Sequence, residues 1–125
     1  MRVVFGADRA GDGRYVPRVL ARTDNSKLWA EPFRGDFTAL TPGGARWLAE
    51  RGTELFGIDY LSVEAYGGDG TVHRVLLKAG VVLLEGLDLS GVEPGPCELW
   101  AAPVKLAGAE AAPARALLRR TGGSG

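Results

Sequence analysis

Short apolar runs separated by glycine- and proline-rich turns dominate the pattern of hydrophobic and polar positions along this chain. Runs of this length, bounded by turn residues, are typical of β-strands. The expected strands cover residues 2–5, 18–22, 54–65, 81–85, 98–106 and 114–120, and a less regular extended segment covers 36–40. The run "VVLLE" (81–85) has no polar residue before its end, which predicts a strand buried on both faces. Pro103 predicts an edge position or a bulge in the strand at 98–106.

Two other stretches have the spacing of amphipathic helices. In "LTPGGARWLAERG", Thr41 suits the N-cap, Pro42 suits the first helical position and Gly52 suits the C-terminal stop. In "VHRVLLKAG", apolar residues share one face between residues 72 and 79, and Gly80 ends the helix. The final segment, 114–120, is compatible with a short helix, although we favour a strand. Helices that alternate with strands predict an α/β fold.

Composition limits the possible functions. The chain has 125 residues, no internal repeat and no low-complexity linker, which predicts one domain over 1–125 with a flexible tail at 121–125. Lys plus Arg and Asp plus Glu each number 15, so no excess charge indicates a nucleic-acid or membrane partner. The glycine-rich fingerprints of dinucleotide sites and P-loops do not occur in the sequence.

Cys97 is the only cysteine, which excludes an internal disulfide and is typical of a reducing compartment. Its surroundings, "CELWAAPVKL", favour a buried structural thiol over a nucleophile, because no second histidine is present to activate it. The apolar runs are too short for a membrane span, and the N-terminus lacks the apolar core of a signal peptide. We therefore expect a cytoplasmic protein.

The single histidine, His73, and a carboxylate twelve residues later, Glu85, flank the second helix and the following strand. The helix carries the chain roughly 10 Å away. The strand carries it back by roughly 16 Å. Both side chains can therefore reach the same neighbourhood, and imidazole with carboxylate is a common ligand set for Zn²⁺ or Mn²⁺. The alternative is a histidine at a helix start and a solvated glutamate at a strand end.

Polar side chains also gather after two of the predicted strands, in "RTDNSKLW" and "GIDYLSVE". Ligands of α/β proteins bind at the carboxyl ends of strands, so these segments are candidate site loops. Asp, Asn and Ser are equally common in plain turns. The candidate pocket residues are Arg22, Asn25, Ser26, Trp29, Asp59 and Ser62, and Trp29 has core packing as its alternative. We expect Trp47 and Trp100 in the core or at an interface.

These segments together resemble the cyclase family, which includes bacterial kynurenine formamidases, isatin hydrolase-like enzymes and polyketide cyclases. The resemblance runs from about Pro17 to Arg120 and includes "FGIDYLSVE" and "HRVLLKAGVVLLEGLDL". It implies a swivelling β/β/α fold and a Zn²⁺ or Mn²⁺ centre that hydrolyses small formyl or cyclic amides such as N-formylkynurenine. It also implies that His73 and Glu85 are metal ligands, because the family has a histidine and a glutamate at this spacing.

The sequence departs from the family in one respect. Members carry an earlier motif, H-x-G-T-H-x-D-x-P-x-H, which supplies further ligands, and a chain with one histidine cannot contain it. Residues 1–16 have no recognisable counterpart in the family, and we expect the chain to lack the family's N-terminal third. We expect a chain that is incomplete as an enzyme on its own and whose site is completed either by a second polypeptide that carries the motif or by the chain's own carboxylates, such as Asp59 or Glu64. The alternatives are a non-catalytic binding or assembly module that forms homo-oligomers, and a truncated product without a function of its own.

Overall fold

The computed structural model describes residues 2–3 and 17–120. Its elements follow in the order β1 (Arg2–Val3), β2 (Arg18–Arg22), the 3-10 helix η1 (Asp24–Ala30), α1 (Pro42–Glu50), β3 (Leu55–Ile58), α2 (Thr71–Lys78), β4 (Val82–Leu84), β5 (Cys97–Pro103) and β6 (Ala114–Arg120). The predicted α/β class is confirmed. The predicted extension of the first strand to residue 5 and the tail at 121–125 lie outside the described residues. No helix in the described ranges combines the length and the apolar character that crossing a bilayer requires.

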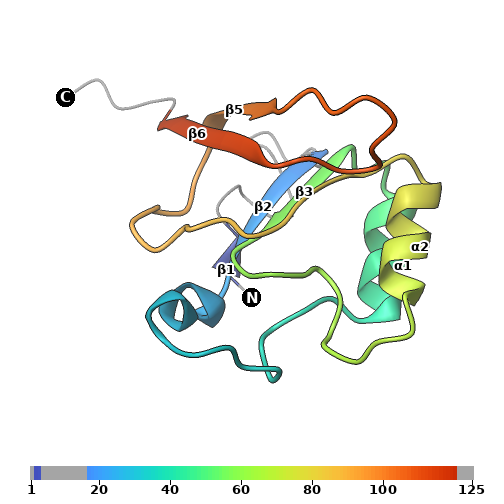
Figure 1. The fold of residues 1–125 in the computed structure, drawn as a ribbon, viewed down its shortest axis with the longest axis horizontal. Helices are drawn as coiled ribbons and strands as arrows, with labels where there is room; N and C mark the ends of the chain where they lie inside the picture. The colour runs from blue at the N-terminus through green and yellow to red at the C-terminus, as the bar shows by residue number, and fades with distance from the viewer. Residues whose placement is uncertain (1, 4–16, 121–125) are drawn as a thin grey trace.

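One sheet has the strand order β1-β2-β3-β4. Strand β1 is antiparallel to β2, whereas β2, β3 and β4 run parallel to one another. Parallel neighbours need crossover connections, and α1 and α2 lie within the two crossovers. Figure 1 shows the two helices side by side on one side of the sheet, with the β5–β6 hairpin on the other.

The core follows the alternation of side chains along the central strands. Val19 and Ala21 of β2, with Phe56 and Ile58 of β3, pack against the helices. The intervening residue Leu20 faces the hairpin, where a second cluster gathers around it. Its members are Leu20, Leu55, Leu87, Leu89, Val92, Cys97, Leu99 and Leu118. The hairpin thus covers the face of the sheet that the helices leave free.

On this second face of the sheet, the side chains of Leu20 and Leu87 pack closely over the backbone of Gly57. A Cβ atom at this position would lie 2.4 Å from Leu20 Cδ2 and 2.9 Å from Leu87 Cδ1. Both contacts are shorter than van der Waals packing permits, so a side chain at this position would require Leu20 and Leu87 to shift.

The residues that the sequence predicted at the ends of α1 and α2 are confirmed in those positions. Thr41 Oγ1 accepts a hydrogen bond from the Gly44 N–H at 3.1 Å, and Pro42 opens α1. Gly52 and Gly80, which follow α1 and α2, have φ values of +73° and +78°. The last segment is strand β6, as favoured, and it pairs antiparallel with β5.

Other expectations are wrong. Residues 36–40 form no strand and contribute only an isolated bridge between Leu40 and Glu64. The run 81–85 is not buried on both faces, because β4 is an edge strand and Val82 is 55% exposed. Trp47 and Trp100 are 40% and 62% exposed, so the core alternative for them is wrong, whereas a place at an interface stays a prediction.

Candidate functional site

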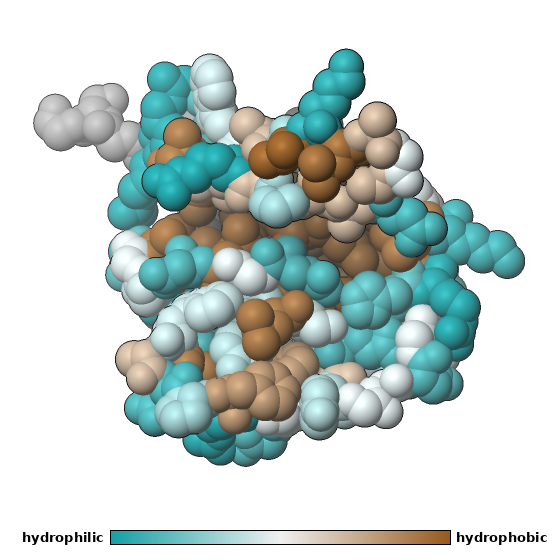
Figure 2. All heavy atoms as spheres, in the orientation of Figure 1, coloured by the Kyte–Doolittle hydropathy of each residue, from teal (hydrophilic) through white to brown (hydrophobic). Residues whose placement is uncertain are grey.

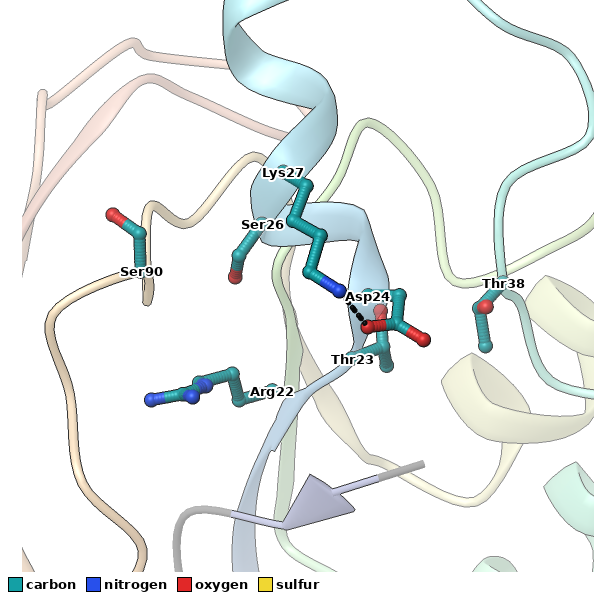
Figure 3. A pocket seen from close by; sticks show the side chains of 7 residues that line it. All are labelled: Arg22, Thr23, Asp24, Ser26, Lys27, Thr38 and Ser90. Carbon is teal, nitrogen blue, oxygen red and sulfur yellow. Dashed lines mark hydrogen bonds and ion pairs between the residues drawn. The ribbon is translucent and has the colours of Figure 1, made fainter.

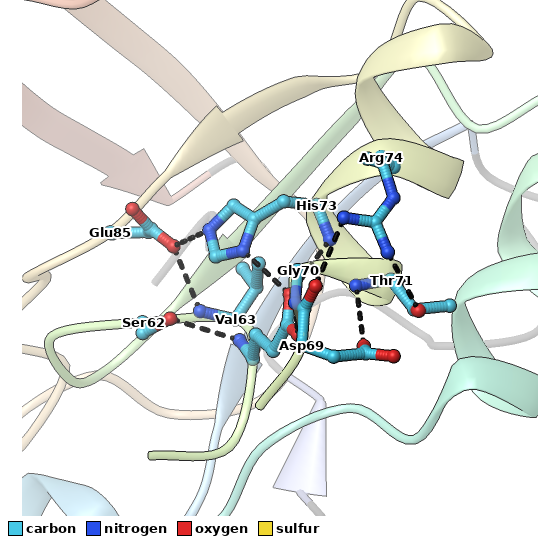
Figure 4. A network of polar contacts seen from close by, with 9 residues as sticks. Ser62, Val63, Asp69, Gly70, Thr71, His73, Arg74 and Glu85 are labelled. Carbon is cyan, nitrogen blue, oxygen red and sulfur yellow. Dashed lines mark hydrogen bonds and ion pairs between the residues drawn. The ribbon is translucent and has the colours of Figure 1, made fainter. Parts of the chain in front are cut away.

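The side chains of His73 and Glu85 meet in the folded chain. His73 lies in the first turn of α2, and Glu85 directly follows β4. Their Nε2 and Oε1 atoms are 3.0 Å apart, and the two side chains are 35% and 34% exposed. Figure 4 shows the imidazole edge directed at the carboxylate. The predicted proximity of these two residues is confirmed, and both remain within reach of solvent.

A second carboxylate, Glu64, contacts the other nitrogen of the same ring. Its Oε2 atom lies 2.8 Å from His73 Nδ1, and its side chain is only 9% exposed. Glu64 follows β3 in the loop that leads to α2. The sequence placed Glu64 in a polar strand-end loop, but nothing in the pattern indicated that it lies behind the imidazole.

The two carboxylates change the charge state of the imidazole. Burial lowers the pKa of His73, but the hydrogen bonds to Glu64 and Glu85 together raise it by more. The pKa of His73 therefore lies above its ordinary value of 6.5. Burial raises the pKa of Glu64, whereas the His73 ring and the N–H groups of His73 and Gly70 lower it below 4.5 overall. The local arrangement therefore favours an imidazolium beside an ionised carboxylate.

His73 and Glu85 are the right kind of ligands for a divalent metal, but they are too few. A catalytic zinc centre uses about three protein ligands and keeps an open position. Within residues 2–3 and 17–120, no group of three or more His, Cys, Asp or Glu side chains is arranged to hold a metal ion. Glu64 contacts Nδ1, whereas Glu85 contacts Nε2 on the other side of the ring. In this arrangement Glu64 therefore cannot be the third ligand of a metal ion bound to Nε2 and Glu85.

An aromatic cleft of about 320 Å³ adjoins this polar cluster. Its walls include Phe33, Phe37 and Tyr66, and His73 and Ser62 also line it. The Phe33 and Tyr66 rings pack edge to face with centroids 5.2 Å apart. Sequence reasoning found Ser62 but missed the aromatic residues, since they come from separate loops without a periodic signal.

Asp59 joins the ends of two neighbouring strands. Its carboxylate is fully buried and accepts hydrogen bonds from the Thr23 N–H and hydroxyl, both at 2.8 Å. It also accepts the Ser26 N–H at 3.1 Å and the Ser26 hydroxyl at 2.5 Å. Asn25 is likewise buried and exchanges two hydrogen bonds with the Thr38 backbone, at 2.8 Å each. Their geometry gives Asp59 and Asn25 a structural role.

The remaining predicted pocket residues do not line the cleft that contains His73. Arg22 and Ser26 line a cavity of about 810 Å³ at the start of η1, shown in Figure 3. This cavity shares no lining residue with the aromatic cleft. Trp29 packs on Tyr60 with ring centroids 5.4 Å apart and donates its indole N–H to the Leu87 carbonyl at 3.2 Å. The structure therefore places only Ser62, among the predicted pocket residues, in the cleft beside the histidine.

Cys97 is partly buried in the second core cluster. Burial raises the pKa of its thiol, and Arg120 lowers it by less. A raised thiol pKa reduces the thiolate fraction, which fits the structural thiol that we expected.

Comparison with known proteins gives relatives for most of the chain, although no family model matches it. Cyclase-like protein 1 of Arabidopsis thaliana is 40% identical over 110 residues, which cover 84% of this chain and 43% of that protein. A kynurenine formamidase of Bordetella petrii is 42% identical over 117 residues, which cover 90% of this chain and 54% of that enzyme.

A solved structure described as a potential metal-dependent hydrolase with cyclase activity has the same fold over the matched part. The TM-score is 0.76 at 39% identity, over 83% of this chain and 52% of the other. These similarities confirm the resemblance to the cyclase family that the sequence indicated. The chain spans about half the length of the relatives it matches.

Proposed function

We propose, from its homology to cyclase-like proteins and kynurenine formamidases, that this chain carries part of the metal centre of an amide hydrolase. In this proposal His73 Nε2 and Glu85 provide two ligands for Zn²⁺ or Mn²⁺. The observation that supports it best is the 3.0 Å approach of these two side chains from different elements of the fold. In enzymes of this class a bound ion polarises the amide carbonyl and lowers the pKa of a water molecule.

The described residues do not complete such a centre. Two ligands leave an ion without the third protein donor that catalytic zinc sites use. We therefore propose that the chain is not catalytically competent alone and that the missing ligands come from the H-x-G-T-H-x-D-x-P-x-H motif of a second polypeptide. A groove of about 520 Å³ between the sheet and the hairpin, lined by leucines together with Asp88 and Arg115, supports such an association. Figure 2 shows a hydrophobic band in this region, below the hairpin.

The aromatic cleft supports a substrate with a planar apolar part. Its position beside His73 would bring a bound aryl group close to the proposed ligands. Aromatic walls favour flat apolar groups through edge and face contacts. We therefore propose small amides, N-formylkynurenine among them, as the substrate class. A swivelling β/β/α arrangement of the complete assembly and a cytoplasmic location belong to the same proposal.

A second candidate function, a non-catalytic module that self-associates, is favoured by the outer face of the hairpin. Trp100 and Leu117 lie directly opposite each other on β5 and β6 and are 62% and 53% exposed. Val104, just beyond β5, is 55% exposed. Large exposed apolar side chains of this kind are typical of association surfaces.

A chimera tests the enzymatic proposal. It joins the part of the Bordetella petrii formamidase that this chain does not match, which the resemblance places on the N-terminal side, to residues 17–125 of this chain. We expect the chimera to bind stoichiometric Zn²⁺ or Mn²⁺ by elemental analysis and to hydrolyse N-formylkynurenine, whereas the chain alone should not turn over.

His73→Ala and Glu85→Ala chimeras should lose metal and activity, while the exposed control Glu50→Gln should keep both. A well-folded His73→Ala chimera that retains its metal and full activity would contradict the proposal.

A further inference from the structure

The imidazole of His73 lies between two carboxylates that differ in how firmly they are held. Glu64 accepts hydrogen bonds from the Gly70 N–H at 2.5 Å and the His73 N–H at 3.1 Å. Among the described residues, Glu85 accepts one backbone hydrogen bond, from the Val63 N–H at 2.9 Å. The Glu64 side chain is 9% exposed and the Glu85 side chain 34% exposed. Glu64 is therefore fixed, whereas Glu85 has access to water.

The loop before α2 closes tightly around Glu64. A Cβ atom on Gly68 would lie 2.6 Å from Glu64 Oε1 and 2.8 Å from its Cγ. Gly70, the N-cap of α2, has a φ of +83°, which glycine adopts without strain. Both glycines let the backbone wrap the carboxylate, so the side chain has little room to turn away from the ring.

This asymmetry decides where a neutral imidazole keeps its proton. Neutral imidazole has one N–H donor and one lone pair, and an ionised carboxylate can only accept. A lone pair on Nδ1 would face a buried carboxylate that cannot move, at 2.8 Å. A lone pair on Nε2 faces Glu85, which can turn toward solvent. Repulsion in the buried position costs more, because the local dielectric is lower.

We propose that Glu64 is a positioning residue that holds His73 as the Nδ1–H tautomer and so leaves the Nε2 lone pair on the side of Glu85. The functional meaning of this inference rests on the proposed function, in which Nε2 is the metal-binding atom. Carboxylates that orient ligating histidines in this way are common around metal centres. The contact between Glu64 and the ring does not itself require a metal.

The single histidine makes the test direct. In 15N-labelled protein, long-range 1H–15N correlation at a pH where the ring is neutral assigns the tautomer without ambiguity. We expect a protonated Nδ1 in the wild-type chain and in Glu85→Gln. We expect a substantial Nε2–H population in Glu64→Gln, because the new amide can donate to Nδ1. Glu50→Gln, an exposed control on α1, should match the wild type.

A Zn²⁺ titration of the same proteins provides the second measurement. Loss of an orienting partner should weaken zinc affinity by about 10–100-fold in Glu64→Gln. A wild-type Nε2–H tautomer overturns the inference and leaves the proposed function standing. A changed tautomer with unchanged zinc affinity overturns the positioning role. If the wild-type tautomer is Nδ1–H but His73→Ala binds zinc as well as the wild type does, the tautomer is supported and the proposed function fails.

Glu64 accepts the N–H groups of Gly70 and His73 at the start of α2, so circular dichroism checks that each variant is folded. The wild-type tautomer alone tests the inference if Glu64→Gln does not fold.

Discussion

The carboxylate of Asp59 accepts two hydrogen bonds from Thr23, one from the backbone N–H and one from the hydroxyl, each 2.8 Å long. Thr23 follows β2, and Asp59 follows β3. The pair therefore connects the carboxyl ends of two parallel strands, next to the loops from which Ser62, Glu64 and the aromatic cleft arise.

We predict that Asp59→Ala destabilises the fold by about 3 kcal/mol, because it leaves the buried donors of Thr23 and the partly buried donors of Ser26 without a partner. Urea unfolding monitored by circular dichroism measures the change. Asp88→Ala provides the control, since the hydrogen bonds of Asp88 within the described part of the chain are both to its exposed neighbour Ser90. Its loss should change stability by less than about 0.5 kcal/mol. Equal losses in the two variants would disprove a special role for Asp59.

A pH dependence of stability follows from the shifted pKa values of His73 and Glu64. The folded-state pKa of His73 is raised above 6.5, so its contribution is complete below that pH and is lost as the pH rises through the folded value. The folded-state pKa of Glu64 is lowered below 4.5, so its contribution is present above that pH and is lost as the pH falls through the folded value.

We therefore expect the cluster to stabilise the fold most between these limits. Urea unfolding of the wild type and His73→Ala in metal-free buffer, at several pH values from 4 to 9, measures the difference. That difference should shrink toward alkaline pH as the imidazolium loses its proton. A difference that does not vary with pH would count against the charged cluster.

Gly57→Ala should weaken the packing of the hairpin on the sheet. The new methyl group would overlap Leu20 and Leu87, and overpacking of this kind costs about 1–3 kcal/mol. Gly91→Ala is a matched control, because a Cβ there would meet nothing within 4 Å. Thermal unfolding of both variants is the measurement, and an unchanged melting temperature for Gly57→Ala would show that the two leucines repack freely.

The exposed pair Trp100 and Leu117 predicts self-association of the purified chain. We expect light scattering at micromolar concentration to give a mass above that of the monomer. The double variant Trp100→Ser and Leu117→Ser should reduce that mass. Leu77→Ser removes a similarly exposed apolar residue from α2 and should leave the mass unchanged. A monomeric wild type would exclude the self-association proposal.

Local signals predicted the helices well and the surroundings of the strands less well. Thr41, Pro42 and Gly52 each act within one turn of α1, so the chain sequence alone marks its ends. The exposure of Val82 depends on its strand being the last in the sheet, which no local run of apolar residues can indicate. Helix η1 was missed because Asp24, Asn25 and Ser26 suit turns and helix starts equally.

The candidate site shows the same division. The distance between His73 and Glu85 follows from one helix, one turn and one strand, and was predictable from spacing. The contact of Glu64 with the ring, and the meeting of Phe33 with Tyr66, depend on how separate loops pack. Such contacts have no period in the sequence, so pattern reasoning could not find them.

The attachment of Glu64 to both the ring of His73 and the first backbone groups of α2 also bears on engineering. Fraying of the helix start would break the same hydrogen bonds that hold the imidazole, so the ring cannot lose its orientation independently of the helix. Anyone transplanting this histidine to another scaffold should therefore move residues 64–73 as one portable cassette. A histidine transferred without these residues would lack the hydrogen bonds that orient its ring.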